Sequence, residues 1–424
     1  MIARAWNRFW FSEGSLLRLA YFRILLMVLC LMDLIAYSGQ AFANAKLVSS
    51  GAPLANWRPI YLFSVLGIEP MGTALAQGIF VAAIVAIAFS ICGLFTRSAC
   101  LVAGVLVLYW SAYCYSFDKP HHEKIAMAFA LIALPLAPAG ARFSLDAFFR
   151  RLRLARKGLS PRLPAMSSEA SFPLRLTQIT IVFGYAFAGW TKLAVSGFEW
   201  ANGYTLMSIL LEYDNSLSKA FTSSVAVAQL FSVGALTLQA TFPLVMFFPR
   251  LRWIYLPAAT SFHLATWWSM GSAHYMTLWF MLIAFIPLER VPAWFKAGLQ
   301  STSWVRKLAV CVSVLVPALG STWVLFLILP KWLLGFLVVP TWGLLLSLSK
   351  APQLQVWLPA QALRARAVLE ALDWSGRLVL HESPATQAGL TVRRVDAPEL
   401  VGREARVAVL RNLPLTSLLA GLAR

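Results

Sequence analysis

Apolar stretches long enough to cross a lipid bilayer recur along most of this chain. A helix needs roughly 17 to 25 predominantly apolar residues to span the hydrocarbon core, and about ten segments meet that requirement. They lie near 16–37, 73–95, 99–117, 123–138, 175–195, 224–248, 253–270, 274–289, 308–329 and 332–349. The predicted fold class is an all-α polytopic transmembrane bundle of about ten helices.

The composition supports a membrane protein and argues against several other classes. Hydrophobic residues make up 59% of the 424 positions and charged residues 12%, with a mean hydropathy of +0.71. The net charge of +19 lies mostly in short loops and in the tail, so we assign it to topology and expect no nucleic-acid partner. The cysteines lie in apolar runs without metal-ligand spacing, so neither a disulfide framework nor a metal site is expected.

The loops differ in charge on the two sides of the predicted membrane. Alternate loops are basic, with Arg97 in the first and a cluster of arginines between 142 and 162 in the second. The other loops mix fewer basic residues with acidic ones. By the positive-inside rule, we expect a multi-pass protein of the bacterial inner (cytoplasmic) membrane with both termini in the cytoplasm.

The chain divides into three parts. We expect a transmembrane domain over 1–300, an additional transmembrane hairpin over 301–350, and a small cytoplasmic α/β module over 351–424. In the module, LQVWLP, RLVLHE and LTVRRVD are predicted strands, and 360–372 and 404–413 are predicted helices. The basic loop 140–173 has two interpretations: an amphipathic helix on anionic lipid headgroups, or a plain topogenic loop.

Lys192 stands near the end of the otherwise apolar span at 175–195. A charge at membrane depth snorkels to the interface, pairs with a partner or works in a cavity, and a dehydrated amine in its neutral form is able to accept a proton. Tyr185 and Gly189 share its helix face, and the glycine allows a ligand or another helix to come close. Beyond the span, we predict an interfacial segment with aromatic anchors, formed by Gly197, Trp200, Gly203 and Tyr204.

Three histidines fall on the same predicted outer side as Lys192, namely His121, His122 and His263. On residue type alone, a solvated loop histidine and an interhelical hydrogen bond remain the alternatives to a functional cluster. Arg23 and Asp33 lie within the span at 16–37, and we expect Arg23 to snorkel toward the inner side. Asp33 is expected to cap or pair with an outer charge, with Lys192 as the candidate.

An ordered set of segments resembles a known family. LAYFRILLMVLCLMDL, GLFTRSAC followed by YW and DK, APAGARFSLDAF, QITIVFGYAFAGWTKL and SFHLATWWSMG are similar to the membrane part of vitamin K-dependent gamma-glutamyl carboxylase. They are also similar to the wider bacterial HTTM family, over roughly residues 16–290. The resemblance implies that Lys192 is the base that activates a vitamin K hydroquinone-like quinol. It also implies active-site roles for His122, with His121 as the alternative, and for His263.

The resemblance further implies a quinol site that faces the periplasm, and we expect it to be lined by His121, Tyr185, Gly189, Trp200 and Tyr204. The sequence departs from the carboxylase in reading WTK where that enzyme has a second lysine, and its large lumenal domain has no counterpart in these 424 residues. The tail resembles a degenerate DCC thiol-oxidoreductase (thioredoxin-like) domain whose CxxC is missing near 360–364.

Two functions follow as hypotheses. The first is a membrane enzyme of carboxylase-like ancestry that acts on a small lipophilic or peptide substrate with a reduced quinone. The second is a non-enzymatic scaffold or lipid-binding protein. Membrane lipid is a partner in both.

Overall fold

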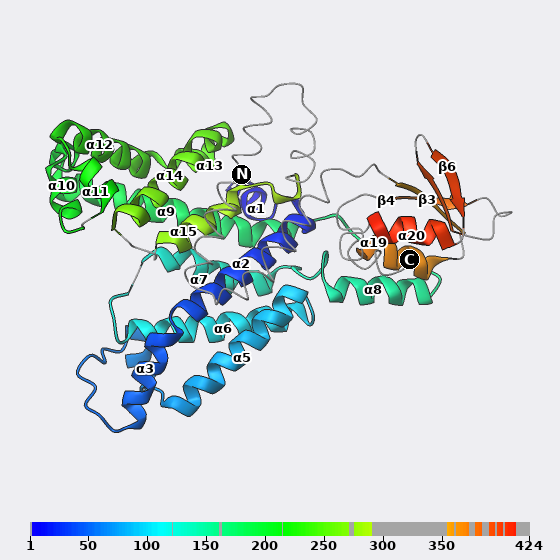
Figure 1. Cartoon of the computed structure of the whole chain (residues 1–424), viewed down its shortest axis with the longest axis horizontal. Helices are drawn as coiled ribbons and strands as arrows, with labels where there is room; N and C mark the ends of the chain where they lie inside the picture. The colour runs from blue at the N-terminus through cyan, green and yellow to red at the C-terminus, as the bar shows by residue number, and fades with distance from the viewer. Residues whose placement is uncertain are drawn as a thin grey trace.

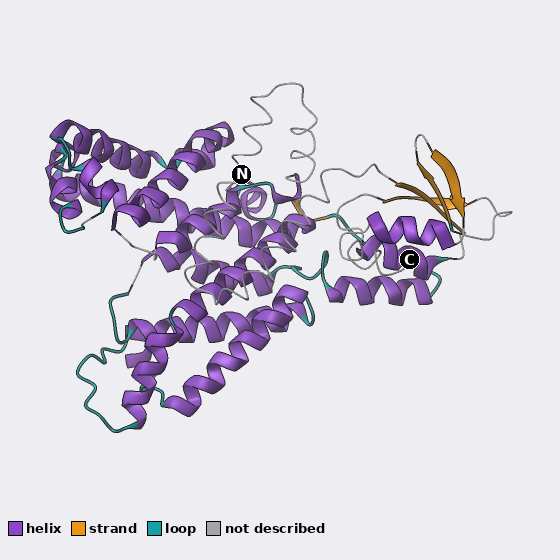
Figure 2. Cartoon of the chain, viewed as in Figure 1, coloured by secondary structure: helices purple, strands orange, loops and turns teal. Residues whose placement is uncertain are grey.

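The computed structural model describes residues 2–120, 122–160, 163–213, 215–270 and 275–290, and in the tail 354–359, 362–372, 378–383, 390–394, 397–401 and 403–412. The two spans predicted at 308–329 and 332–349 lie outside the described residues, as does His121. Figure 2 shows that helices dominate the part before 290 and that the larger sheet belongs to the tail.

Within the described residues, four stretches of helix are long and apolar enough to cross a membrane. They are α2 (Leu16–Ala36), α5 (Thr73–Cys92), α6 (Thr96–Tyr115) and the stretch Ser168–Ser196, most of which is α9 (Ser171–Ser196). Each coincides with a segment that hydropathy selects. The described chain is therefore a mostly helical membrane protein with a small α/β region at its C-terminal side.

The other predicted spans that fall within the described residues are shorter or interrupted. α7 (Ile125–Ala133) passes into the 3-10 helix η2 (Leu134–Leu136) at Pro135, and α12 (Val225–Thr241) ends two residues before Pro243. Proline has no backbone N–H and disfavours helix in the residue before it, which explains both breaks. The later elements are α13 (Leu244–Phe247), η5 (Pro249–Leu251), α14 (Arg252–Met270), α15 (Tyr275–Met281), η6 (Leu282–Phe285) and η7 (Leu288–Arg290).

Short helices connect these elements. They are α1 (Ile2–Trp10), α3 (Ser38–Ser49), α4 (Tyr61–Val65), η1 (His122–Lys124), α8 (Leu145–Arg156), η3 (Ser168–Ala170), η4 (Glu199–Asn202), α10 (Tyr204–Leu210) and α11 (Ser216–Phe221). The basic loop thus contains the amphipathic helix that one interpretation predicted, α8. Ser144 caps it by accepting a hydrogen bond from the backbone of Ala147.

A two-stranded clamp joins the starts of α2 and α9. β1 (Gly14–Ser15) pairs antiparallel with β2 (Met166–Ser167), directly before the two helices. We call this side of the bundle, with β1 and β2, the clamp end. From it α2 runs toward α3 and α9 runs toward α10 and α12, and the two helices diverge (Figure 1).

The charges of α2 have partners that the sequence analysis did not predict. Arg23 does not reach an interface: it is fully buried and donates hydrogen bonds to the carbonyls of Ala139 (2.6 Å) and Phe143 (2.7 Å). The reason is that the 139–143 segment folds over the guanidinium and supplies acceptors in place of water.

Asp33 pairs with Lys124, whose Nζ lies 2.9 Å from both carboxylate oxygens. The expected pairing of Asp33 with Lys192 is therefore wrong. Its physical reason is the divergence of α2 from α9, which carries the two residues to different parts of the bundle (Figure 1). Lys124 also lies over the ring of Tyr37, 3.8 Å from the ring centroid.

The tail forms a four-stranded sheet with two helices. Its elements are β3 (Leu354–Pro359), α19 (Leu363–Leu372), β4 (Leu378–Ser383), β5 (Thr391–Arg394), β6 (Ala397–Val401) and α20 (Arg403–Asn412). The strand order is β4-β3-β5-β6, with β3 and β4 parallel and the other pairs antiparallel. β6 is an addition to the predicted strands, and it is an edge strand that contains Pro398, which is where a sheet tolerates proline.

Candidate functional site

The face of α9 that carries Tyr185, Gly189 and Lys192 packs against α12 (Figure 1). Gly189 is the point of closest approach: a Cβ added there would lie 2.5 Å from the backbone nitrogen of Ala240. The neighbouring Trp190 donates its indole N–H to the Ala240 carbonyl at 3.0 Å. Of the two roles open to the glycine, the structure supports contact with another helix.

Lys192 is half-buried one turn beyond this contact. Its Nζ donates to the side-chain oxygen of Gln239 at 2.9 Å and to the carbonyl of Ala188 at 3.3 Å. The indole ring of Trp200, from η4, lies 5.0 Å from the same nitrogen. Within the part of the chain that the structure describes, no carboxylate lies within ion-pair distance of Lys192, so the amine is held by neutral groups.

Tyr185 and His263 form a buried pair deeper in the bundle. The Tyr185 hydroxyl and His263 Nε2 are 2.5 Å apart, and the two residues are 3% and 1% exposed. Phe242 stacks on the Tyr185 ring with centroids 4.1 Å apart. Seven residues of helix separate Tyr185 from Lys192, a rise of about 10 Å along α9. The structure therefore joins His263 to the lysine-bearing face through Tyr185.

Two further predicted site residues lie in short helices. His122 is in η1, before α7, and its side chain is exposed. Tyr204 begins α10 and is 62% exposed, with its backbone N–H bound to the side chain of Asn202. Gly203, between Asn202 and Tyr204 in the sequence, is buried against the backbone of Gln229. Its φ of +91° is one that glycine adopts without strain. Of the residues predicted around Lys192, the structure brings Trp200 directly to its amine.

Comparison with models of protein families identifies the family of this chain. A model of the HTTM domain matches residues 14–289, which is well over half of the chain. The chain belongs to the HTTM family. Neither a curated protein nor a solved structure matches it.

The matched HTTM region contains Lys192, Tyr185 and His263 together with the four long apolar helices. Membership in this family supports a membrane protein of carboxylase-like ancestry. It agrees with the resemblance that the ordered motifs indicate, and it does not extend to the tail, since the match ends at 289.

Sequence reasoning missed one residue that contacts Lys192. Gln239 stands within an apolar span, is 7% exposed and accepts the hydrogen bond from Lys192. An amide residue in an apolar span indicates a contact with another helix, as a lysine there does, because both side chains need a hydrogen-bond partner at membrane depth. Applying that rule to α12 as well as to α9 predicts both members of the pair.

The contacts of Lys192 indicate what chemistry its amine can perform. An amine held by an amide oxygen, a backbone carbonyl and an aromatic face retains a lone pair when it is neutral. Across the described ranges, no group of three His, Cys, Asp or Glu side chains is placed to hold a metal ion. The groups present suit proton transfer and the binding of a flat, apolar molecule with a hydroxyl group.

Proposed function

We propose that this HTTM protein is a membrane enzyme of carboxylase-like ancestry that uses a reduced quinone or a similar lipid-like substrate, with Lys192 as its base. The carrying observation is the environment of the amine: Gln239, Ala188 and Trp200 contact it and no carboxylate among the described residues neutralises it. An amine without a carboxylate partner is more readily present in its neutral form, and so available to act as a base, than a lysine locked in an ion pair, because an adjacent carboxylate stabilises the ammonium form.

A quinol fits the groups around Lys192. When bound, it supplies an acidic hydroxyl and the electrons for a reaction with oxygen. Lys192 takes up the hydroxyl proton at Nζ, and the carbonyl oxygens of Gln239 and Ala188 then stabilise the ammonium that forms. Trp200 provides an aromatic face for the ring and a cation–π contact for the charged amine.

The remaining predicted residues take supporting roles in this proposal. The Tyr185–His263 hydrogen bond fixes α9 against α14, two turns before Lys192, and so holds the lysine in a constant position relative to α14. His122, from η1, assists the base, with His121 as the alternative. The site faces the periplasm in the orientation that the loop charges favour.

The test is quinol oxidation by the purified full-length protein in detergent, with the rate measured as oxygen uptake. Lys192→Met removes the amine and retains most of the side-chain volume, and it is expected to abolish oxidation while the unfolding temperature changes little. Lys46→Met is the matched control, because Lys46 is exposed in the last turn of α3. If Lys192→Met oxidises the quinol at the wild-type rate, Lys192 is not the base.

A second function, a non-enzymatic scaffold or lipid-binding role, is favoured by the burial of the Tyr185–His263 pair. A tyrosine and a histidine that are 3% and 1% exposed suit a hydrogen bond that only fixes two helices. On this alternative the wild type binds lipid, shows no quinol-dependent oxygen uptake, and loses no function with Lys192→Met.

A further inference from the structure

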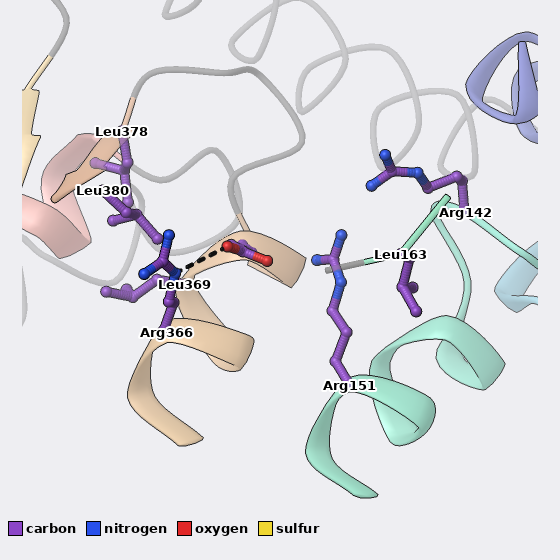
Figure 3. Close-up of a pocket in the computed structure, with 8 residues that line it drawn as sticks. Arg142, Arg151, Leu163, Arg366, Leu369, Leu378 and Leu380 are labelled. Carbon is purple, nitrogen blue, oxygen red and sulfur yellow. Dashed lines mark hydrogen bonds and ion pairs between the residues drawn. The ribbon is translucent and has the colours of Figure 1, made fainter. Parts of the chain in front are cut away.

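A cavity of about 460 Å³ lies between the basic loop of the membrane part and the tail. α8 and the segment near Leu163 form one side, and α19 and β4 form the other (Figure 3). Its volume is in the range of sites for small molecules. It is remote from Lys192, since α8 leaves the bundle at the clamp end whereas Lys192 lies in the last turns of α9 (Figure 1).

Three arginines and one glutamate line this cavity. Arg366 is neutralised, because its guanidinium pairs with Glu370 and Glu382 at 3.2 Å each. Arg142 donates its Nε to the carbonyl of Pro164 at 2.9 Å. Among the described residues, neither Arg142 nor Arg151 forms an ion pair, so the cavity keeps an excess of positive charge.

Arg151 is the more constrained of the two unpaired arginines. It is 8% exposed, and its buried Nε has no hydrogen-bond partner among the described residues. Figure 3 shows its guanidinium rising from α8 into the space toward which Arg142 also reaches. Burial lowers the pKa of the Arg151 guanidinium and that of Arg142 below the ordinary arginine value, and the nearby Glu370 carboxylate opposes this shift only in part.

From these contacts we propose that the cavity binds a phosphate group, carried by an anionic lipid headgroup or by a soluble phosphate ester. Two unpaired guanidiniums present planar donor pairs that match the oxygens of phosphate, and a bound anion provides the partner that Arg151 lacks. The two positive charges balance a phosphate monoester. A buried arginine without a partner is costly, so Arg151 is expected in a site that is filled in the working protein.

The rest of the cavity wall is apolar and suits a ligand with a hydrocarbon part. Four leucines line it: Leu163, Leu369, Leu378 and Leu380. The burial of acyl chains or a similar apolar group against these leucines is favourable and adds to the charge-assisted hydrogen bonds. The position next to an amphipathic basic helix is also where a lipid headgroup is accessible.

The experiment uses the purified full-length protein in a non-ionic detergent and measures binding by calorimetry. Dioctanoyl phosphatidic acid is the lipid probe, and glycerol 3-phosphate is the same phosphate without acyl chains. Dioctanoylglycerol, which has the chains and no phosphate, reports apolar binding alone. We expect saturable binding of phosphatidic acid at one site and none of dioctanoylglycerol. Binding of glycerol 3-phosphate with comparable affinity assigns the site to soluble esters, and its failure to bind assigns the site to lipid.

The variants separate the cavity from the general charge of α8. Arg151→Gln is expected to weaken phosphatidic acid binding at least tenfold, whereas Arg153→Gln, the same charge change at an exposed position of α8, changes it less than twofold. Leu163→Trp fills the cavity, retains every arginine and is expected to weaken binding to the same extent. This variant decides the matter if Arg151→Gln does not fold.

Three results overturn the proposal. The first is that neither phosphate probe binds the wild type. The second is that dioctanoylglycerol binds as tightly as phosphatidic acid. The third is that Arg151→Gln and Arg153→Gln weaken binding equally, which assigns the effect to the charge of the helix surface.

Discussion

The buried ion pair of Asp33 and Lys124 allows a quantitative test of the helical bundle. Lys124 Nζ lies 2.9 Å from both carboxylate oxygens, and the two side chains are 5% and 6% exposed. At an effective dielectric constant of 20, two unit charges at this separation attract by about 6 kcal/mol. Removing one partner leaves a buried charge, so we expect Lys124→Met or Asp33→Asn alone to lower the free energy of unfolding by about 3–5 kcal/mol.

The double variant removes both charges and avoids the unpaired state. We expect its loss to be well below the sum of the two single losses, with a coupling energy of about 3 kcal/mol. The assay is denaturant unfolding of the purified protein in detergent, and tryptophan fluorescence reports the unfolded fraction. The control cycle uses Arg97 and Glu169, which are 3.8 Å apart with side chains 64% and 58% exposed. Their coupling is expected to stay below about 1 kcal/mol.

A coupling energy for Asp33 and Lys124 that is no larger than the control value would refute this reasoning. It would mean that water or lipid headgroups screen the pair in the folded protein. The same measurement therefore reports whether this part of the bundle is dry.

Two further predictions concern the contacts of α9. Gly189→Ala is expected to lower the free energy of unfolding by about 1–3 kcal/mol, because the new Cβ meets the backbone of Ala240. Gly184→Ala on the same helix meets nothing within 4 Å and is expected to be neutral or slightly stabilising, and equal losses would contradict the packing argument. Tyr185→Phe retains the ring and removes the hydrogen bond to His263. We expect a loss of about 1–3 kcal/mol in the same unfolding assay, and no loss would show that the bond is not formed.

The positions of the long helices are predictable from the sequence because hydropathy is a local property. The segments at 16–37 and 73–95 correspond to α2 and α5 within a few residues at each end. The breaks in the shorter spans are also local, since Pro135 and Pro243 mark them. The boundary of a span is thus predictable wherever proline or a change in hydropathy stands at the position itself.

The partners of buried charges are not predictable in the same way. Arg23 is held by carbonyls of the 139–143 segment, and Asp33 is held by a lysine 91 residues away. Both contacts depend on how helices and loops pack, which residue type alone does not encode. The same limit applies to the candidate site: the pattern identifies Lys192 and its shared face with Tyr185, whereas Gln239 as the hydrogen-bond partner requires the packing of α12 on α9.

The clamp of β1 and β2 has a consequence for how the protein is made. Residue 15 pairs with residue 166, so the clamp before α2 forms only after about 150 further residues have been synthesised, roughly 8–30 s at 5–20 residues per second. During that interval Arg23 and Asp33 stand in the nascent chain before Ala139 and Lys124 have emerged. A ribosome-bound fragment that stops short of residue 124 therefore holds both charges without their native partners. We expect alkaline carbonate to extract α2 of such a fragment from the membrane, and not to extract it once the later segments have been synthesised.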